Sequence, residues 1–188
     1  MKSAKQGSAI GQYYLGEAYE NGTGVSKDEK KAFEWLKKSA EQGFAQGQHE
    51  VGQSFRYGRG FITKNYNKAL EWYKKASENG NKHSLNNLGN MYFNGLGVPK
   101  DINVAKSLFY AASDHGSGLA DFNLAMMYGH CEIDQTSALH SLTLFFMASL
   151  KGVKEATRVL KRLKQIFPRR TLISANAKAI SSHASGQK

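Results

Sequence analysis

The feature that most constrains this chain is an internal repeat of 36 or 37 residues. In each unit an apolar residue is followed directly by a small residue. An aromatic residue lies four positions after the apolar one. The apolar residues that open these blocks are Leu15, Val51, Leu88 and Leu124, spaced by 36, 37 and 36 positions. Fourteen of the 19 glycines keep the same register. A period of this length indicates a solenoid of stacked supersecondary units.

Each unit is predicted to fold as two helices joined by a glycine-rich loop, because its small and apolar residues recur at helical spacing. The first helices are expected over residues 9–19, 45–55, 84–92 and 120–128, and the second over 29–41, 68–78, 102–114 and 138–150. The residues before the second helices are favoured N-caps: Asp28, Asn65, Asp101 and Ser137. Glycines follow the second helices at 43, 80, 116 and 152, where they suit a left-handed helix end.

Glycine also recurs inside the first helix of three units, as Gly16, Gly52 and Gly89. Glycine costs a helix interior roughly 1 kcal/mol relative to alanine, so its recurrence indicates a close approach of the second helix. Trp35 and Trp72 are expected to fill the groove beside these glycines. The loops between the two helices carry paired glycines, which allow positive φ angles: Gly22/Gly24, Gly58/Gly60 and Gly95/Gly97. A phosphate-binding loop is a poor alternative, because no predicted strand precedes any of them.

The pattern Leu15-Gly16, Tyr19, Gly22-x-Gly24-Val25, Asp28, Ala32, Trp35, Ala40 and Gly43 closely resembles the Sel-one-like repeat (SLR), a relative of the tetratricopeptide repeat. The resemblance extends over residues 1 to about 152. It implies an all-α, right-handed α/α superhelical solenoid of helix-turn-helix repeats. It also implies a bacterial scaffold or adaptor that binds other proteins and is not an enzyme.

The register divides the chain into units. Residues 1–7 are expected to be the tail of a truncated preceding repeat of a longer protein, because Gly7 lies 36 positions before Gly43. The four repeats are predicted at 8–43, 44–80, 81–116 and 117–152, and the fourth has an atypical loop in which Cys131 and Ile133 replace glycines. Residues 153–188 are expected to form a basic capping helix, a degenerate last helix and a frayed tail. In that last helix, Ala177, Ile180 and Ala184 would continue the register.

The first helices are expected to turn a stripe of variable residues to the concave side of the solenoid. Amide and aromatic side chains on successive repeats can contact an extended polypeptide, because each amide offers both donors and an acceptor. The predicted partner-binding residues are Tyr14, Glu17, Glu50, Gln53, Tyr57, Asn87, Asn90, Asn94, Asn123 and Met126. Ordinary exposed helix positions are the alternative interpretation. Three asparagines in eight residues favour binding, because asparagine is a poor helix former.

Charge is distributed unevenly along the chain. Residues 1–150 carry 16 Lys/Arg and 14 Asp/Glu, whereas residues 151–188 carry 10 Lys/Arg and one Glu. The expected basic patch consists of Lys154, Arg158, Lys161, Arg162, Lys164, Arg169 and Arg170. It predicts, as the alternative function, binding of nucleic acid or an anionic membrane through the C-terminal cap. An acidic protein partner and a merely solubilising cap remain open for the same residues.

No catalytic or metal-binding constellation is evident. His130, Cys131 and His140 are close in sequence, but a metal site needs three or four ligands and a nucleophile needs an orienting group. No apolar run approaches the length of a membrane span, and residues 1–5 do not resemble a signal peptide. We expect a monomer without cofactor or metal that binds a protein or peptide, and not nucleic acid or a membrane.

Overall fold

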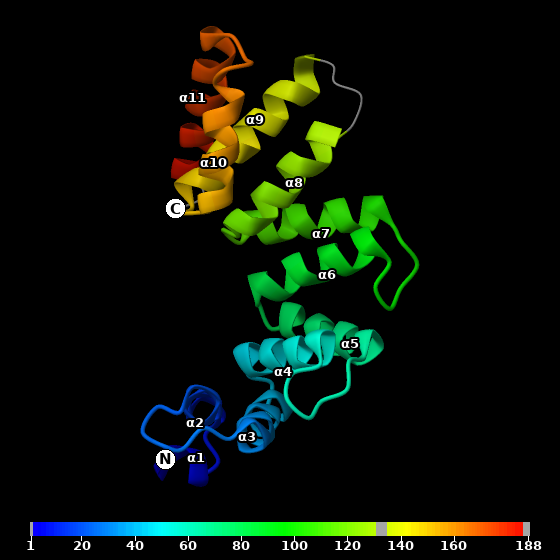
Figure 1. Ribbon diagram of the computed structural model, residues 1–188, viewed down its shortest axis with the longest axis vertical. Helices are drawn as coiled ribbons and strands as arrows, with labels where there is room; N and C mark the ends of the chain where they lie inside the picture. The colour runs from blue at the N-terminus through cyan, green and yellow to red at the C-terminus, as the bar shows by residue number, and fades with distance from the viewer. Residues whose placement is uncertain (1, 131–134, 186–188) are drawn as a thin grey trace. The chain divides into compact units, whose positions relative to one another are not determined.

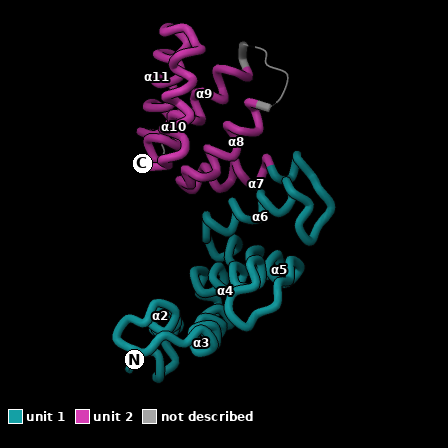
Figure 2. Tube along the Cα trace, viewed as in Figure 1, with its two compact units in different colours: residues 1–105 teal, residues 106–188 magenta. Residues whose placement is uncertain are grey.

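The computed structural model describes residues 2–130 and 135–185 (Figure 1). Over these two ranges the chain forms eleven α-helices and no strand, which confirms the all-α prediction. The predicted atypical loop at Cys131 and Ile133 lies outside the described residues. The chain divides into two compact units, residues 1–105 and 106–188, with the boundary inside α7 (Ile102–Asp114) (Figure 2).

The first unit is a succession of short helices, each packed against the next along the chain. They are α1 (Lys2–Lys5), α2 (Ala9–Asn21), α3 (Glu29–Glu41), α4 (Ala45–Tyr57), α5 (Tyr66–Glu78) and α6 (Lys82–Asn94). The helices from α2 to α6 have 13 residues each, a length at which an isolated helix is marginal in water. Packing against neighbouring helices therefore supplies most of their stability.

Side-chain caps fix where the second helices begin. Asp28 Oδ1 accepts from the Lys31 amide at 2.9 Å, and Asn65 Oδ1 accepts from the Lys68 amide at 3.0 Å. Asp101 Oδ1 accepts from two amides of the first turn of α7, at 2.9 and 3.0 Å. These three predicted caps are confirmed.

The fourth predicted cap is wrong. The helix α9 (Gln135–Leu150) begins two residues before Ser137, so Ser137 lies in its first turn. Two caps at the start of first helices were not predicted: the side chains of Ser8 and Asn81 accept from amides of α2 and α6.

Glycines adopt the left-handed conformations that the sequence predicts. The four that follow second helices have φ between +79° and +86°, and they are Gly43, Gly80, Gly116 and Gly152. The paired loop glycines, which run from the Gly22/Gly24 pair of the first repeat to the Gly95/Gly97 pair of the third, have φ between +58° and +73°. These angles would strain any other L-residue, so the loops depend on glycine.

The glycines inside first helices do permit close helix packing, but the predicted partner side chains are wrong. A Cβ at Gly16 would lie 2.7 Å from Leu36 Cγ, and a Cβ at Gly52 would lie 2.8 Å from Tyr73 Cδ1. Trp35 and Trp72 are each one position earlier, which turns them about 100° around the helix. Both indoles are half-buried, with the ammonium groups of Lys38 and Lys75 at 4.4 and 4.7 Å from the ring centroids.

The second unit is built around α9, which packs against three helices. These are α8 (Gly118–His130), α10 (Lys154–Leu163) and α11 (Arg169–Ser185). Leu142 and Phe145 of α9 are buried, as is Leu124 of α8. The predicted capping helix is α10, which buries Ala156 and Leu160 and exposes its charged residues.

The last helix exists, but its predicted register is wrong. Ala175 and Ala179 are fully buried, whereas Ala177, Ile180 and Ala184 are exposed. Small residues allow α11 to approach α9 closely, and this packing selects a different face of the helix. The helix also continues through the serine-rich stretch to Ser185, so the frayed-tail prediction is wrong up to that residue.

Candidate functional site

The predicted stripe in the first unit lies on α2, α4 and α6, and we call it the first-helix face. Its members are Tyr14, Glu17, Glu50, Gln53, Tyr57, Asn87, Asn90 and Asn94. None of them is buried, whereas Leu15, Val51 and Leu88, each one position after a stripe residue, are all buried. Tyr14 and Tyr57 are 62% and 56% exposed. The face therefore offers two large aromatic side chains and several polar groups to a partner.

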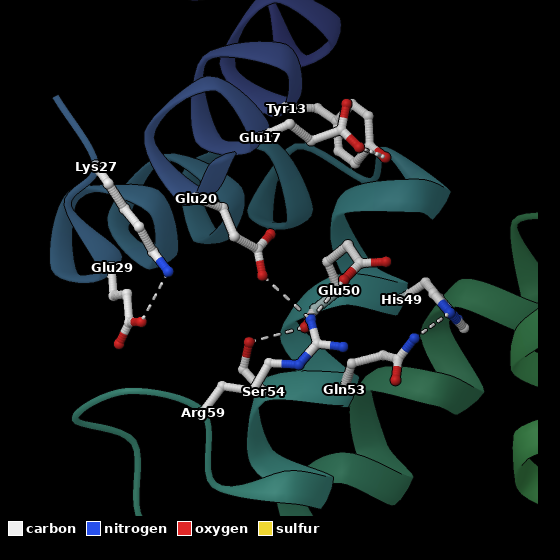
Figure 3. Close-up of polar contacts among 10 residues, drawn as sticks. All are labelled: Tyr13, Glu17, Glu20, Lys27, Glu29, His49, Glu50, Gln53, Ser54 and Arg59. Atoms are coloured by element: carbon white, nitrogen blue, oxygen red, sulfur yellow. Dashed lines mark hydrogen bonds and ion pairs between the residues drawn. The ribbon is translucent and has the colours of Figure 1, made fainter. Parts of the chain in front are cut away.

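The carboxylate of Glu50 is held in place by an arginine from the loop after α4. Arg59 Nη1 lies 3.1 Å from Glu50 Oε2 and 3.4 Å from Glu20 Oε1 (Figure 3). Burial raises the pKa of Glu50, and the Arg59 guanidinium opposes that rise. The arginine thus bridges α2 and α4 and offsets part of the effect of burial on the Glu50 carboxylate.

Arg59 was not predicted as a site residue. It occupies the variable position between the paired loop glycines, where the other units carry Thr23 and Leu96. This departure from the repeat is the sequence signal that could have found it.

A small cavity adjoins this bridge. Its volume is about 210 Å³, and it reaches from Arg59 and Ser54 to Phe33 and Leu36 of α3. Lys27 and Glu29 border it and form an ion pair of 3.5 Å (Figure 3). The charged groups at its rim are thus already paired with one another.

A tyrosine hydroxyl positions Glu17. Tyr13 donates to Glu17 Oε1 at 2.8 Å (Figure 3). Its ring packs edge-on against Tyr14 and Phe44 at centroid distances of 5.3 Å. Burial, and then the bond to Glu17, raise the pKa of Tyr13, so its hydroxyl keeps the proton that it donates.

Gln53 is positioned by a buried histidine. The Gln53 amide nitrogen donates to His49 Nε2 at 3.1 Å (Figure 3). The ring proton is therefore on Nδ1, which donates to Ser84 Oγ at 2.8 Å. Burial lowers the pKa of His49 to about 4, with further lowering by His83, Arg59 and Arg56. The Ser84 hydroxyl is fully buried, so this serine–histidine contact is a link between α4 and α6 rather than an exposed nucleophile.

Two of the three predicted asparagines already have partners inside the protein. Asn87 Oδ1 accepts from Arg56 Nη1 at 3.1 Å, which ties α6 to α4 of the preceding repeat. Asn94 Nδ2 donates to the Asn90 carbonyl at 2.8 Å within its own helix. The exposed Tyr14 and Tyr57 therefore become the stronger candidates for partner contact.

The remaining stripe residues belong to the second unit. Asn123 is half-buried on α8, and Met126 is exposed there. Met126 also borders an apolar pocket of about 230 Å³ lined by residues of α8, α9 and α10.

The basic patch also lies in the second unit, on α10 and the start of α11. All seven of its side chains are exposed, and none forms an ion pair with another described residue. On α10, Lys154, Arg158 and Lys161 lie on the side opposite the buried Ala156 and Leu160. The patch is thus a cationic surface without internal counter-charge.

Within residues 2–130 and 135–185, no group of three or more His, Cys, Asp and Glu side chains is placed to hold a metal ion. In the same part of the chain, no helix has both the length and the apolar character needed to cross a membrane.

Comparison with solved structures finds several helical repeat proteins. A Sel1 repeat protein from Oxalobacter formigenes is 35% identical, with a TM-score of 0.74, over 84% of this chain and 65% of its own length. A protective antigen of uropathogenic Escherichia coli with an SLR fold is 26% identical, with a TM-score of 0.59, over 94% of this chain and 46% of its own. The chain thus spans less than two thirds of either protein.

An immunity protein from Pseudomonas aeruginosa shares the fold at 24% identity and a TM-score of 0.62, with 95% of this chain and 64% of that protein covered. A search of curated proteins found none that matches the chain.

A family model described as the Sel1 repeat matches residues 9–44, 45–81 and 82–117, which together make more than half of the chain. Each match begins and ends one residue after a repeat predicted from the sequence. Proteins with Sel1 repeats are in general non-catalytic scaffolds for protein–protein interaction. With three matched repeats and an all-helical fold shared with solved Sel1 repeat proteins, the chain belongs to the Sel1 repeat family.

Proposed function

We propose that this protein is a non-enzymatic scaffold that binds an extended segment of another protein on the first-helix face. The observation that carries the proposal is that every member of this face is accessible to solvent, with Tyr14 and Tyr57 more than half exposed. Tyrosine combines a large apolar ring with a polar hydroxyl and loses little conformational entropy on binding, which suits it to interfaces.

The polar groups of the face are held in position before any partner arrives. Glu17 is held by Tyr13, Glu50 by Arg59 and Gln53 by His49. A partner therefore does not have to order these side chains, which lowers the entropic cost of association. The bond to His49 uses the amide nitrogen of Gln53, so the amide oxygen can accept from a backbone N–H of the segment.

In the second unit, considered by itself, we propose that Asn123 and Met126 contact a protein segment in the same manner. Met126 borders the pocket of about 230 Å³, whose lining is mainly apolar and includes Leu142 and Phe145. A flexible thioether at the edge of such a pocket can adapt to an apolar side chain of the segment.

The proposal is tested with peptides selected from a phage library of random 16-residue sequences. Selected peptides are labelled with fluorescein, and their Kd values are measured by anisotropy. The paired variant Tyr14→Ala/Tyr57→Ala and the single variant Gln53→Ala are each expected to weaken binding at least 10-fold. The control is Glu34→Ala/Glu71→Ala, which changes two exposed residues of α3 and α5 and is expected to alter Kd less than twofold.

Far-UV circular dichroism checks that each variant keeps its helical content. The proposal would be overturned if the Kd of the peptides were unchanged by the first-helix variants but increased in the α3/α5 control.

A further inference from the structure

Hollows surround the turn between α10 and α11 in the second unit, and Phe167 lines three of them. One, of about 470 Å³, lies among Phe146 of α9, Lys164, and Arg169, Leu172 and Ile173 of α11. A second, of about 710 Å³, includes Leu139 of α9 together with Arg170 and Ser174 of α11. The third is the pocket of about 230 Å³ that also borders Met126. The half-buried Phe167 ring thus contributes to the wall of all three hollows.

Large apolar side chains are also exposed in the turn before α11 and along α11. Ile166 is 74% exposed in the turn, and Ile173 and Ile180 of α11 are 60% and 52% exposed. On α11, Ile173, Ala177 and Ile180 follow one another at helical spacing, and all are exposed while Ala175 and Ala179 pack against α9. Apolar residues grouped in this way on a soluble protein mark an interaction surface.

The same region is entirely cationic. No aspartate or glutamate occurs after Glu155, whereas eight lysines and arginines do. Lys164 and Arg169 border the hollow of about 470 Å³, and Arg170 borders the larger one. None of these three forms an ion pair with another described residue. An apolar floor is therefore surrounded by cations that lack counter-charges.

We propose that this surface binds an acidic segment of a partner protein that carries large apolar side chains. We call it the α10–α11 groove, consisting of Phe146, Lys164, Phe167, Arg169, Leu172 and Ile173. Apolar side chains of the segment enter the hollows against Phe146 and Leu172. Its carboxylates meet Lys164 and Arg169, and an arginine guanidinium can hold a carboxylate through two hydrogen bonds. This interaction goes beyond the proposed peptide binding on the first-helix face, because it uses other residues and a partner of opposite charge.

The charge of the groove argues for a different protein rather than a second copy of this chain. A symmetric dimer through this surface would place two sets of unpaired cations against each other, which is unfavourable. Sequence-independent binding of single-stranded nucleic acid uses several aromatic rings on which bases stack, and Phe167 is the only aromatic residue after Phe146. An anionic membrane would satisfy the cations but would leave recessed apolar walls such as those at Phe146 and Leu172 without contacts.

The test uses three 18-residue probes labelled with fluorescein. The first is a designed amphipathic peptide with glutamates on one helical face and leucine and phenylalanine on the other. The second is a scrambled peptide of the same composition without an apolar face, and the third is polyglutamate. Vesicles containing 30% phosphatidylserine and a 20-nucleotide single-stranded DNA are measured in parallel.

The variants separate charge from shape. Lys164→Glu/Arg169→Glu reverses charge at the rim of the α10–α11 groove, and Ile173→Ser removes an exposed apolar side chain. The matched control, Lys5→Glu/Lys30→Glu, makes the same change in net charge at exposed residues of the first unit. Because every substituted residue is exposed, the variants are expected to keep the circular dichroism spectrum of the wild type.

The amphipathic peptide is expected to bind at least 10-fold more tightly than either other peptide. The rim variant should weaken its binding at least 10-fold and Ile173→Ser about fivefold, with less than a twofold effect of the control. Equal affinity for all three peptides would overturn the proposal, because charge alone would then explain binding. Preferential binding of the vesicles or the DNA, or no binding of the amphipathic peptide, would overturn it as well.

Discussion

Asp121 and Lys151 form a buried ion pair at the positions where the first two repeats have pairs of amides. Lys151 Nζ lies 2.8 Å from Asp121 Oδ2, and the Ser113 hydroxyl donates to Oδ1. The corresponding contacts are Gln42 to Gln12, at 2.7 Å, and Asn79 to Gln48, at 3.0 Å. Each contact joins the first helix of a repeat to the residue that follows its second helix. The second unit therefore makes with charges a link that the first unit makes with neutral groups.

Lys151→Met is expected to destabilise the protein by about 3 kcal/mol at pH 7, because it leaves the Asp121 carboxylate buried without a counter-ion. Asp121→Gln/Lys151→Gln restores the amide pair of the earlier repeats and is expected to recover most of the loss. Urea unfolding measures both. A double variant as unstable as Lys151→Met would contradict the interpretation.

The defect of Lys151→Met should depend on pH. Burial raises the pKa of Asp121 in the native state, and the lysine opposes that rise, so removing the lysine raises the pKa further. An acid whose native pKa exceeds its unfolded pKa destabilises the native state at high pH, and the destabilisation disappears as the native carboxyl is protonated. The stability difference from wild type is therefore expected to shrink as the pH falls from 7 to 4.5.

His49 should make the wild type sensitive to acid. Its pKa of about 4 in the native state is below the ordinary value of 6.5, so the unfolded state binds the proton more strongly. Stability from this group is complete above pH 6.5 and is lost as the pH falls towards 4, by about 3 kcal/mol in all. His49→Gln retains an amide for Ser84 and does not titrate.

Urea unfolding from pH 7 to pH 4 compares the two proteins. Wild type is expected to lose more stability than His49→Gln by about 3 kcal/mol, since the other titrating groups, including His83, are common to both. Parallel pH profiles would show that His49 is not held neutral by burial.

Gly52→Ala should destabilise the protein by about 1–3 kcal/mol, because the new methyl group would lie 2.8 Å from the buried Tyr73 ring. Gly129→Ala is the matched control in α8, where the nearest atom is Ser141 Oγ at 3.6 Å. There the better helix propensity of alanine is expected to add up to about 1 kcal/mol. Thermal unfolding of the two variants should shift Tm in opposite directions, and two shifts of the same sign would argue against the packing explanation.

Asn65→Ala should lower the stability of the first unit by about 1 kcal/mol, because the Lys68 amide loses its cap at 3.0 Å. Asn65→Asp retains an acceptor and is the control, with an expected change within about 0.5 kcal/mol of wild type. Hydrogen exchange of amides in the first turn of α5 measures the effect locally. Faster exchange in both variants would indicate that the side-chain oxygen is not what protects these amides.

Much of the fold could be predicted from the sequence because the signals are local. Helix caps such as Asp28 and Asn65 depend on a few adjacent residues, and so do left-handed glycines such as Gly43. Both can therefore be predicted from the local sequence. The residues of the first-helix stripe could also be predicted to be exposed, because positions such as Tyr14 and Tyr57 follow the repeat register.

Contacts between helices were less predictable. The glycine at 52 indicated a close approach, but whether Trp72 or Tyr73 meets it depends on the rotation of α5 about its axis. Sequence periodicity locates such a face only to about one residue, or 100° of rotation. The partners of Asn87 and Glu50 were missed for a related reason: Arg56 and Arg59 are not periodic features, and their reach across helices depends on side-chain geometry.

The sequence by itself determined the repeat, the helix pairs, the turn geometry and membership of the Sel1 repeat family. Each of these depends on short motifs that recur at a fixed period. Only the tertiary structure decided which side of α11 packs on α9, and hence that Ile173 and Ile180 remain exposed beside unpaired cations. The physical reason is that a helix with alanines on one face and isoleucines on another can pack through either. The close approach that Ala175 and Ala179 allow to α9 selects between them.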